Sequence, residues 1–206
     1  MPADAFPPAL VVHAFEGIVP VVDPSAWVHP SAVLLGDVIV GPRCYVGPGA
    51  VMRGDFGRIE LRAGANLQDN CVVHSLPDFD CVMEEDSHIG HGAVIHGCHV
   101  SRGALVGMNA VVMDRAVVGE RAVVAAMAFV KIGGRIPPAV LAAGIPARVV
   151  RELSEAEMAG KHLGTTMYHA LAERCLAGVR PAAPLTAPEP DRRRSDWSMF
   201  PIDPAA

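Results

Sequence analysis

The sequence predicts an all-β solenoid, a parallel β-helix built from hexapeptide repeats, followed by a C-terminal α-helix. Aliphatic residues recur every six positions, and a small residue follows most of them four positions later. Aromatic residues make up only 5% of the chain, whereas Gly and Pro occupy 20 and 18 of its 206 positions. A six-residue period is too short for a helical hairpin and too regular for an ordinary β-sandwich. It indicates short strands joined by tight corners, with three repeats closing each triangular coil.

The repeats place the solenoid over residues 21–136, after an N-terminal extension over residues 1–20. The aliphatic positions are Val28, Leu34, Val40, Val46, Met52, Leu61, Leu67, Val73, Ile89, Ile95, Val100, Val106, Val112, Val118, Val124 and Val130. The small residues are Ala32, Cys44, Ala50, Ala65, Cys71, Ala93, Ala104, Ala110, Ala116, Ala122 and Ala128. Corner glycines, at Gly41, Gly47, Gly90, Gly107 and Gly119, are expected where positive φ or close packing is needed. Pro137 and Pro138 lack amide donors and are expected to end the ladder.

The C-terminal third leaves the repeat pattern. Residues 137–153 are expected to connect the solenoid to the helix and to lay a last extended segment along it. Ser154 and Glu157 form a capping-box motif, which predicts a helix over residues 154–177. Residues 178–206 are rich in proline and contain an arginine cluster at 192–194, so we expect an extended, weakly ordered tail.

Composition and charge exclude two classes of partner. The net charge is -5 and the chain has no long cationic run, so it lacks the electrostatic footprint of a nucleic-acid binder. Charged residues interrupt the most apolar region, residues 104–130, and no membrane span is expected. The first ten residues have an acid and three prolines instead of a secretory signal, and the five cysteines form no C-x-x-C pair. We therefore expect a cytoplasmic protein whose thiols are mostly core residues.

Two histidines share one position in their repeats. His74 follows inward-pointing Val73, and His96 follows inward-pointing Ile95. They are 22 residues apart, which is one 18-residue coil plus four, and residues 75–87 between them have the composition of an inserted loop. Stacked strands lie about 4.8 Å apart. Both imidazoles could therefore reach one metal ion, at about 2.0–2.1 Å per nitrogen.

His91 lies in the preceding repeat and should face another side of the triangle. If three solenoids pack around a threefold axis, His91 of one chain could meet His74 and His96 of its neighbour. Three imidazoles and a water form an open catalytic site, and zinc, ferrous iron and cobalt all accept it. The alternative is that these are surface histidines flanking a loop.

Two polar clusters lie near the same coils. Arg53 could form a bidentate ion pair with Asp69 across an interface between chains. Gln68 could hydrogen-bond a metal-bound hydroxide. Taken separately, each cluster could simply be solvated surface.

These residues resemble the γ-class carbonic anhydrase family of left-handed β-helix trimers, and within it the PaaY and CaiE subgroup. The shared pattern is Arg53-x-Asp55, Gln68-Asp69, His74 and His91-x-x-x-x-His96, together with RGDFGRI, ANLQDNC, HIGHGAVIHGC, LVGMNAVVMDRAVVGE and RELSEAE. The resemblance implies left-handed coils and a homotrimer with metal sites at its interfaces, built by His74 and His96 of one chain and His91 of the next. It also implies that Arg53, Asp55 and Asp69 hold the interface and orient ligand, and that Gln68 lies beside the metal-bound water.

PaaY-like proteins are thioesterases acting on CoA adducts of phenylacetate catabolism. The resemblance therefore implies hydrolysis of an acyl-CoA substrate by metal-bound hydroxide, most naturally with zinc. Phe56 and Pro77 stand where the anhydrase pattern has glutamates, and this disfavours fast proton export. Three alternatives remain: a carbonic anhydrase hydrating CO2, a hexapeptide acyltransferase using CoA, and a non-catalytic scaffold.

Overall fold

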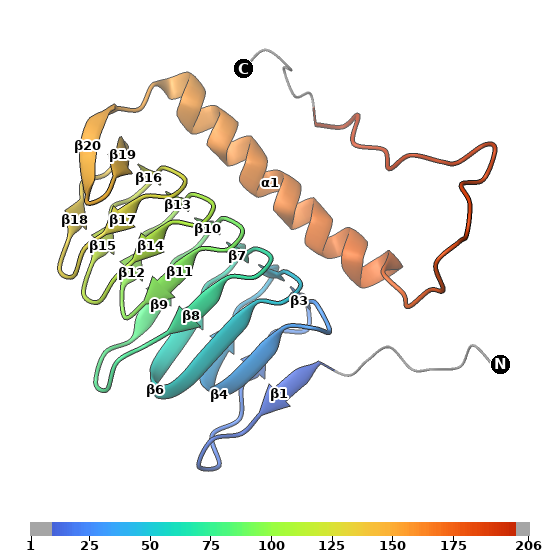
Figure 1. The fold of residues 1–206 in the computed structure, drawn as a ribbon, viewed down its shortest axis with the longest axis horizontal. Coiled ribbons are helices and arrows are strands. Elements are labelled where there is room, and N and C mark those ends of the chain that lie inside the picture. Colours follow the sequence, from blue (N-terminus) through green and yellow to red (C-terminus); the bar gives the residue numbers. More distant parts are fainter. Residues whose placement is uncertain (1–9, 201–206) are drawn as a thin grey trace.

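The computed structural model describes residues 10–200, and within that range the chain forms twenty strands and one helix. The strands stack into a triangular parallel solenoid with α1 running back along it, from the last coil toward the first (Figure 1). This is the left-handed hexapeptide β-helix with a terminal helix that the sequence predicts. The solenoid has three faces.

The first face, here called the helix face, is one eight-stranded sheet. Its parallel strands are β3 (Trp27–Val28), β5 (Tyr45–Val46), β7 (Asn66–Leu67), β10 (His88–Ile89), β13 (Leu105–Val106), β16 (Val123–Val124) and β19 (Val140–Gly144). The eighth strand, β20 (Ala147–Glu152), pairs antiparallel with β19 and closes the end of the sheet.

The other two faces form one twelve-stranded sheet, because the long strands β4 (Val33–Val40) and β6 (Val51–Leu61) bend from one face to the next. The histidine face contains β1 (Val11–His13), the first halves of β4 and β6, β8 (Val72–His74), β11 (Val94–His96), β14 (Val111–Val112) and β17 (Phe129–Val130). The outer face contains β2 (Val21–Val22), the second halves of β4 and β6, β9 (Cys81–Met83), β12 (His99–Val100), β15 (Val117–Val118) and β18 (Arg135–Ile136).

The core is a column of aliphatic and small side chains, as the six-residue pattern predicts. Val106, for example, pairs with Ile89 below it and Val124 above it, and all three are fully buried. The predicted aliphatic positions from Leu34 to Val130 are buried, and so are all the predicted small positions. All five cysteines are buried and free. Such stacking removes a continuous apolar surface from water, which is the main driving force of the fold.

The structure differs from the sequence prediction in two places. The ladder continues past residue 136, because Pro137 and Pro138 lie in a corner and β19 then pairs parallel with β16. The segment expected to be one inserted loop, residues 75–87, contains the buried strand β9. Only residues 75–80 lie outside the regular coil, and there Leu76 and Phe79 form an isolated antiparallel bridge. The predicted extension, residues 1–20, contributes β1, and its first nine residues lie outside the described range.

Helix α1 (Glu155–Gly178) begins at the predicted capping box, in which Ser154 and Glu157 satisfy each other's backbone amides. It packs on the helix face through Ala172 and Cys175, which meet Trp27 and Tyr45. No helix among residues 10–200 is long and apolar enough to cross a membrane.

The tail after α1 contacts the helix again. Its Trp197 ring lies 4.2 Å from the guanidinium carbon of Arg174. Arg174 also donates a 2.7 Å hydrogen bond to the carbonyl of Asp196. The rest of the predicted tail, residues 201–206, lies outside the described range.

The corner glycines explain why coils can stack so closely. A Cβ on Gly107 would overlap the backbone of Ala125 and Ala126 in the next coil, although its φ is not positive. We predict that Gly107→Ala lowers the free energy of unfolding by about 1–3 kcal/mol, because overpacking must displace backbone. Gly160→Ala is the matched control: nothing lies within 4 Å of its Cβ, so it should stabilise α1 by about 0.5–1 kcal/mol. Urea denaturation measures both, and an unchanged Gly107→Ala would refute this packing.

Candidate active site

His74 and His96 end neighbouring strands of the histidine face and are paired in register. The Nδ1 atom of His74 lies 3.0 Å from the Nε2 atom of His96, and the ring centroids are 5.0 Å apart. The predicted stacking of these two side chains is therefore observed. Arg53 stands in the same column, one coil below His74.

Each of these imidazoles has a carboxylate behind it. Asp55 Oδ1 lies 3.0 Å from His74 Nε2, and Asp114 Oδ1 contacts His96 Nδ1. An ionised carboxylate only accepts hydrogen bonds, so these two ring nitrogens carry the protons. The nitrogens that face each other then both present lone pairs, and only a cation or an added proton can lie between them without repulsion. This donor set, two imidazoles oriented by carboxylates, is the one that zinc and similar divalent ions prefer.

The surroundings of the pair favour the ionised form of Asp55 and the neutral form of His74. Partial burial opposes ionisation of Asp55, but hydrogen bonds from Arg53 and His74 outweigh it and hold its pKa below the ordinary value. Burial lowers the pKa of His74, and the hydrogen bond to Asp55 offsets this only in part. Phe56 lies beside the pair, with its ring centroid 5.1 Å from that of His74, and is 57% exposed. The pair therefore has a charged side and an apolar side.

His91 lies at the other end of the same face, in the corner that precedes β11. Its Nδ1 atom contacts Asp69 Oδ2, which leaves Nε2 free to meet another molecule. The His91 side chain is 47% exposed. Among residues 10–200, no group of three or more His, Cys, Asp or Glu side chains forms a metal-binding cluster within one chain. One chain thus presents two oriented imidazoles at one corner and a single oriented imidazole at another.

A pocket of about 290 Å³ lies beside His91, between the solenoid and α1, and Gln68, His88 and Tyr168 line it. Gln68 is almost fully buried, and its Nε2 donates to Asn66 Oδ1 at 3.0 Å while also facing His88. The edge of His88 meets the Tyr168 ring, with centroids 5.2 Å apart. Burial lowers the pKa of His88 to about 3 and raises that of Tyr168 to about 12, so both are neutral at pH 7.

The structure thus sorts the predicted site residues into two groups. His74, His96, Arg53 and Asp55 share one corner, where Arg53 Nη1 lies 2.6 Å from Asp55 Oδ2. The other corner brings together His91, Asp69 and Gln68.

Sequence reasoning missed the carboxylate that orients His96. Ile95 pairs with Val112, so the position in register with His96 in the next coil is Met113, and Asp114 lies one residue beyond it, within contact of His96. The signal available in the sequence is an acidic residue within one position of the register point, about one coil after His96.

Comparisons with known proteins agree with this architecture. The family model described as "Bacterial transferase hexapeptide (six repeats)" matches residues 20–54. A hexapeptide transferase family protein from Anaplasma phagocytophilum superimposes with a TM-score of 0.76 at 36% identity, covering 79% of this chain and 96% of that one. A structure described as a putative acetyltransferase from Bacillus cereus gives a TM-score of 0.80 at 30% identity, covering 82% and 98%. Fold and repeats together define a hexapeptide-repeat protein of the bacterial transferase type.

Two curated relatives identify the family more closely. The carnitine operon protein CaiE of Salmonella typhimurium is 54% identical over 182 residues, covering 88% of this chain and 92% of the relative. CaiE of Proteus sp. is 50% identical, covering 89% and 93%. The chain therefore belongs to the CaiE family of hexapeptide-repeat proteins. This confirms the CaiE part of the expected resemblance, whereas the PaaY and carbonic anhydrase parts stay predictions.

The buried His88 makes a specific acid dependence testable. Its pKa is about 3 when folded and about 6.5 in an unfolded chain, so between these values only the unfolded state binds the proton. The free energy of unfolding should fall as pH drops from 6.5 toward 3. His88→Gln should flatten this slope, whereas His13→Gln, on exposed β1, should retain it. Denaturant titrations at several pH values measure the slope, and equal slopes in the wild type and His88→Gln would contradict the assignment.

Proposed function

We propose that the protein is a metal-dependent hydrolase of acyl-CoA thioesters that works as a homotrimer. The observation that supports this most is the pair of nitrogens on His74 and His96, 3.0 Å apart and each backed by a carboxylate. His91 of a second copy, oriented by Asp69, would complete the ligand set. The free, buried cysteines agree with the cytoplasmic location that belongs to the same proposal.

Zinc is the expected ion, with ferrous iron or cobalt as alternatives. When bound, it supplies a water acidic enough to attack a carbonyl at neutral pH and a positive charge that polarises that carbonyl. The chain's own groups hold the geometry. Asp55, Asp114 and Asp69 fix the protonated nitrogen of each imidazole, so the other nitrogen is free to coordinate. Gln68, anchored through its amide nitrogen to Asn66, lies on the His91 side and would hydrogen-bond the attacking water or the substrate carbonyl.

Phe56 favours a thioester over CO2. An aromatic ring that is 57% exposed beside His74 offers an apolar surface to an acyl group, which CO2 does not need. A phenylalanine side chain cannot relay protons, and fast CO2 hydration depends on a proton relay beside the metal site. The resemblance to PaaY implies an acyl group derived from phenylacetate, whereas the CaiE relatives are named for a carnitine operon. Aryl and quaternary-ammonium acyl groups are therefore both substrates to test.

Acyl transfer is the second candidate. It is favoured by the 30% identity to a protein described as a putative acetyltransferase and by the transferase description of the matching repeat model. A transferase would use the same thioester but deliver the acyl group to an amine or hydroxyl. It would not require the three-histidine site.

We predict that the metal-loaded protein releases free CoA from phenylacetyl-CoA or a related thioester without any added acceptor. Chelation should abolish this activity, and zinc should restore it. His96→Ala should lower kcat at least about a hundredfold, because the metal and its water are lost together. A thiol-release assay on a thioester panel, beside stopped-flow CO2 hydration on the same preparation, measures this. Strong hydration without thiol release would establish the anhydrase instead, and acceptor-dependent release that survives His96→Ala would establish the transferase.

We also predict that Asp114→Asn weakens zinc binding about 10- to 100-fold, the usual cost of losing a carboxylate that orients a histidine ligand. Glu84→Gln is the matched control. Glu84 Oε1 contacts His99 Nε2 at 2.9 Å in a similar arrangement, but on the outer face. Competition with a chromogenic chelator measures both affinities. Equal losses in the two variants would show that Asp114 has no special role at the metal.

A further inference from the structure

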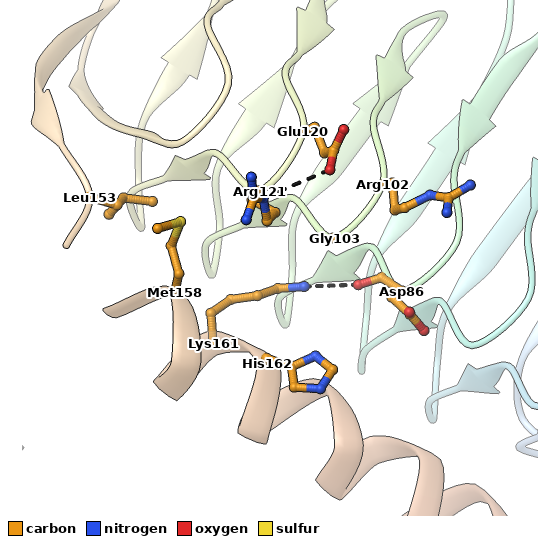
Figure 2. Close-up of a pocket in the computed structure, with 9 residues that line it drawn as sticks. All are labelled: Asp86, Arg102, Gly103, Glu120, Arg121, Leu153, Met158, Lys161 and His162. Atoms are coloured by element: carbon orange, nitrogen blue, oxygen red, sulfur yellow. Dashed lines mark hydrogen bonds and ion pairs between the residues drawn. The ribbon is translucent and has the colours of Figure 1, made fainter. Parts of the chain in front are cut away.

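A second cavity lies away from the histidine face. It is found where the first half of α1 crosses the corner between the outer face and the helix face (Figure 2). Asp86, Gly103 and Arg121 occupy equivalent corner positions in successive coils, with φ of 58°, 61° and 55°. Gly103 has no side chain, so the column has a gap. A Cβ placed there would lie 3.5 Å from Arg121 Cγ and 3.9 Å from Lys161 Nζ. The resulting cavity of about 180 Å³ far exceeds the roughly 10–15 Å³ that one water needs.

The ammonium group of Lys161, which lines this cavity, has fewer hydrogen-bond acceptors than donors. Its Nζ donates a 2.8 Å hydrogen bond to the backbone carbonyl of Asp86, the one such bond found for it among residues 10–200. An ammonium group has three donors. Figure 2 shows the side chain reaching from α1 toward Asp86, past Gly103. The remaining donors require an acceptor from solvent or from a ligand in the cavity.

A second cation, Arg121, lies beside Lys161 and also favours an anion in the cavity. Arg121 lies on the cavity wall and has only a loose ion pair, 3.7 Å from the exposed carboxylate of Glu120. Two acids also line the cavity: Glu120, which is the partner of Arg121, and Asp86, whose carboxylate lies 3.2 Å from His169 Nε2. His162 lines the same cavity. Burial lowers the pKa of Lys161 to about 8, so the amine is still mostly protonated at pH 7 but poorly compensated.

The other end of the cavity is apolar. Leu153, at the start of the segment leading into α1, and Met158, one turn before Lys161, form this wall (Figure 2). An inorganic anion would leave this wall in contact with water. A molecule with a charged head and a short hydrocarbon part would satisfy both ends at once.

We propose that this cavity binds a small organic carboxylate. The carboxylate accepts hydrogen bonds from the Lys161 ammonium and the Arg121 guanidinium, and a chain of a few carbons packs against Leu153 and Met158. The site is separate from the histidine corners and does not depend on the proposed hydrolysis.

Isothermal titration calorimetry of the full-length protein with sodium butyrate, at pH 7 and constant ionic strength, tests the proposal. Butyrate should bind more tightly than acetate, which lacks most of the chain. Butyramide, which has the same shape without the charge, and inorganic phosphate should bind at least about tenfold more weakly. Lys161→Met and Arg121→Gln should each weaken butyrate at least about tenfold.

Lys131→Met is the matched control, because Lys131 is the chain's only other lysine and lies exposed away from the cavity. It should bind butyrate like the wild type. Circular dichroism and thermal melts establish that each variant is folded. Equal binding of butyrate by folded Lys161→Met, equal binding of butyramide, or tighter binding of phosphate than of butyrate would each overturn the proposal.

Discussion

In-register pairing between coils is the constraint on which the rest of the structure depends. Apart from β20, which pairs antiparallel with β19, the strands pair in parallel with those one coil away, so a residue type repeated at the coil length forms a column along the solenoid. Aliphatic columns make the core. The same rule stacks Arg53, His74 and His96 on the histidine face. It also places Asp86, Gly103 and Arg121 in one column at the opposite corner, where the missing side chain opens a cavity.

The repeat made much of this predictable from sequence. Because each face takes about six residues, the core positions and the pairing of His74 with His96 can be predicted by counting along the repeats. The structure differs from the sequence prediction in two segments where the six-residue pattern is interrupted. Cys81 and Met83 of β9 are buried, but they lie in a segment whose acidic neighbours read as a loop. Pro137 and Pro138 read as a stop, yet a corner needs no amide donor there, so the ladder resumes at Val140.

The site was harder to predict than the fold, because side-chain direction decides its chemistry. The spacing indicated that His91 faces away from His96, and the structure adds that Asp69 orients it toward the exterior. Asp114 escaped notice because it is one step out of the histidine column, although it lies one coil from His96. The cavity beside Lys161 had no sequence signal, since it depends on how α1 crosses the corner. Such packing between distant segments is not contained in a local repeat.

The central claim is that two chains divide one set of coordinating nitrogens between them. It is tested most directly by mixing two inactive variants, His91→Ala and His96→Ala, in one preparation that is unfolded and reassembled. Each mixed interface that takes His91 from one variant and His74 with His96 from the other is intact, so about a quarter of the sites should regain metal and activity under random assembly. Recovery to that level is the predicted result. Mixed trimers that remain as inactive as either variant alone would contradict a shared site.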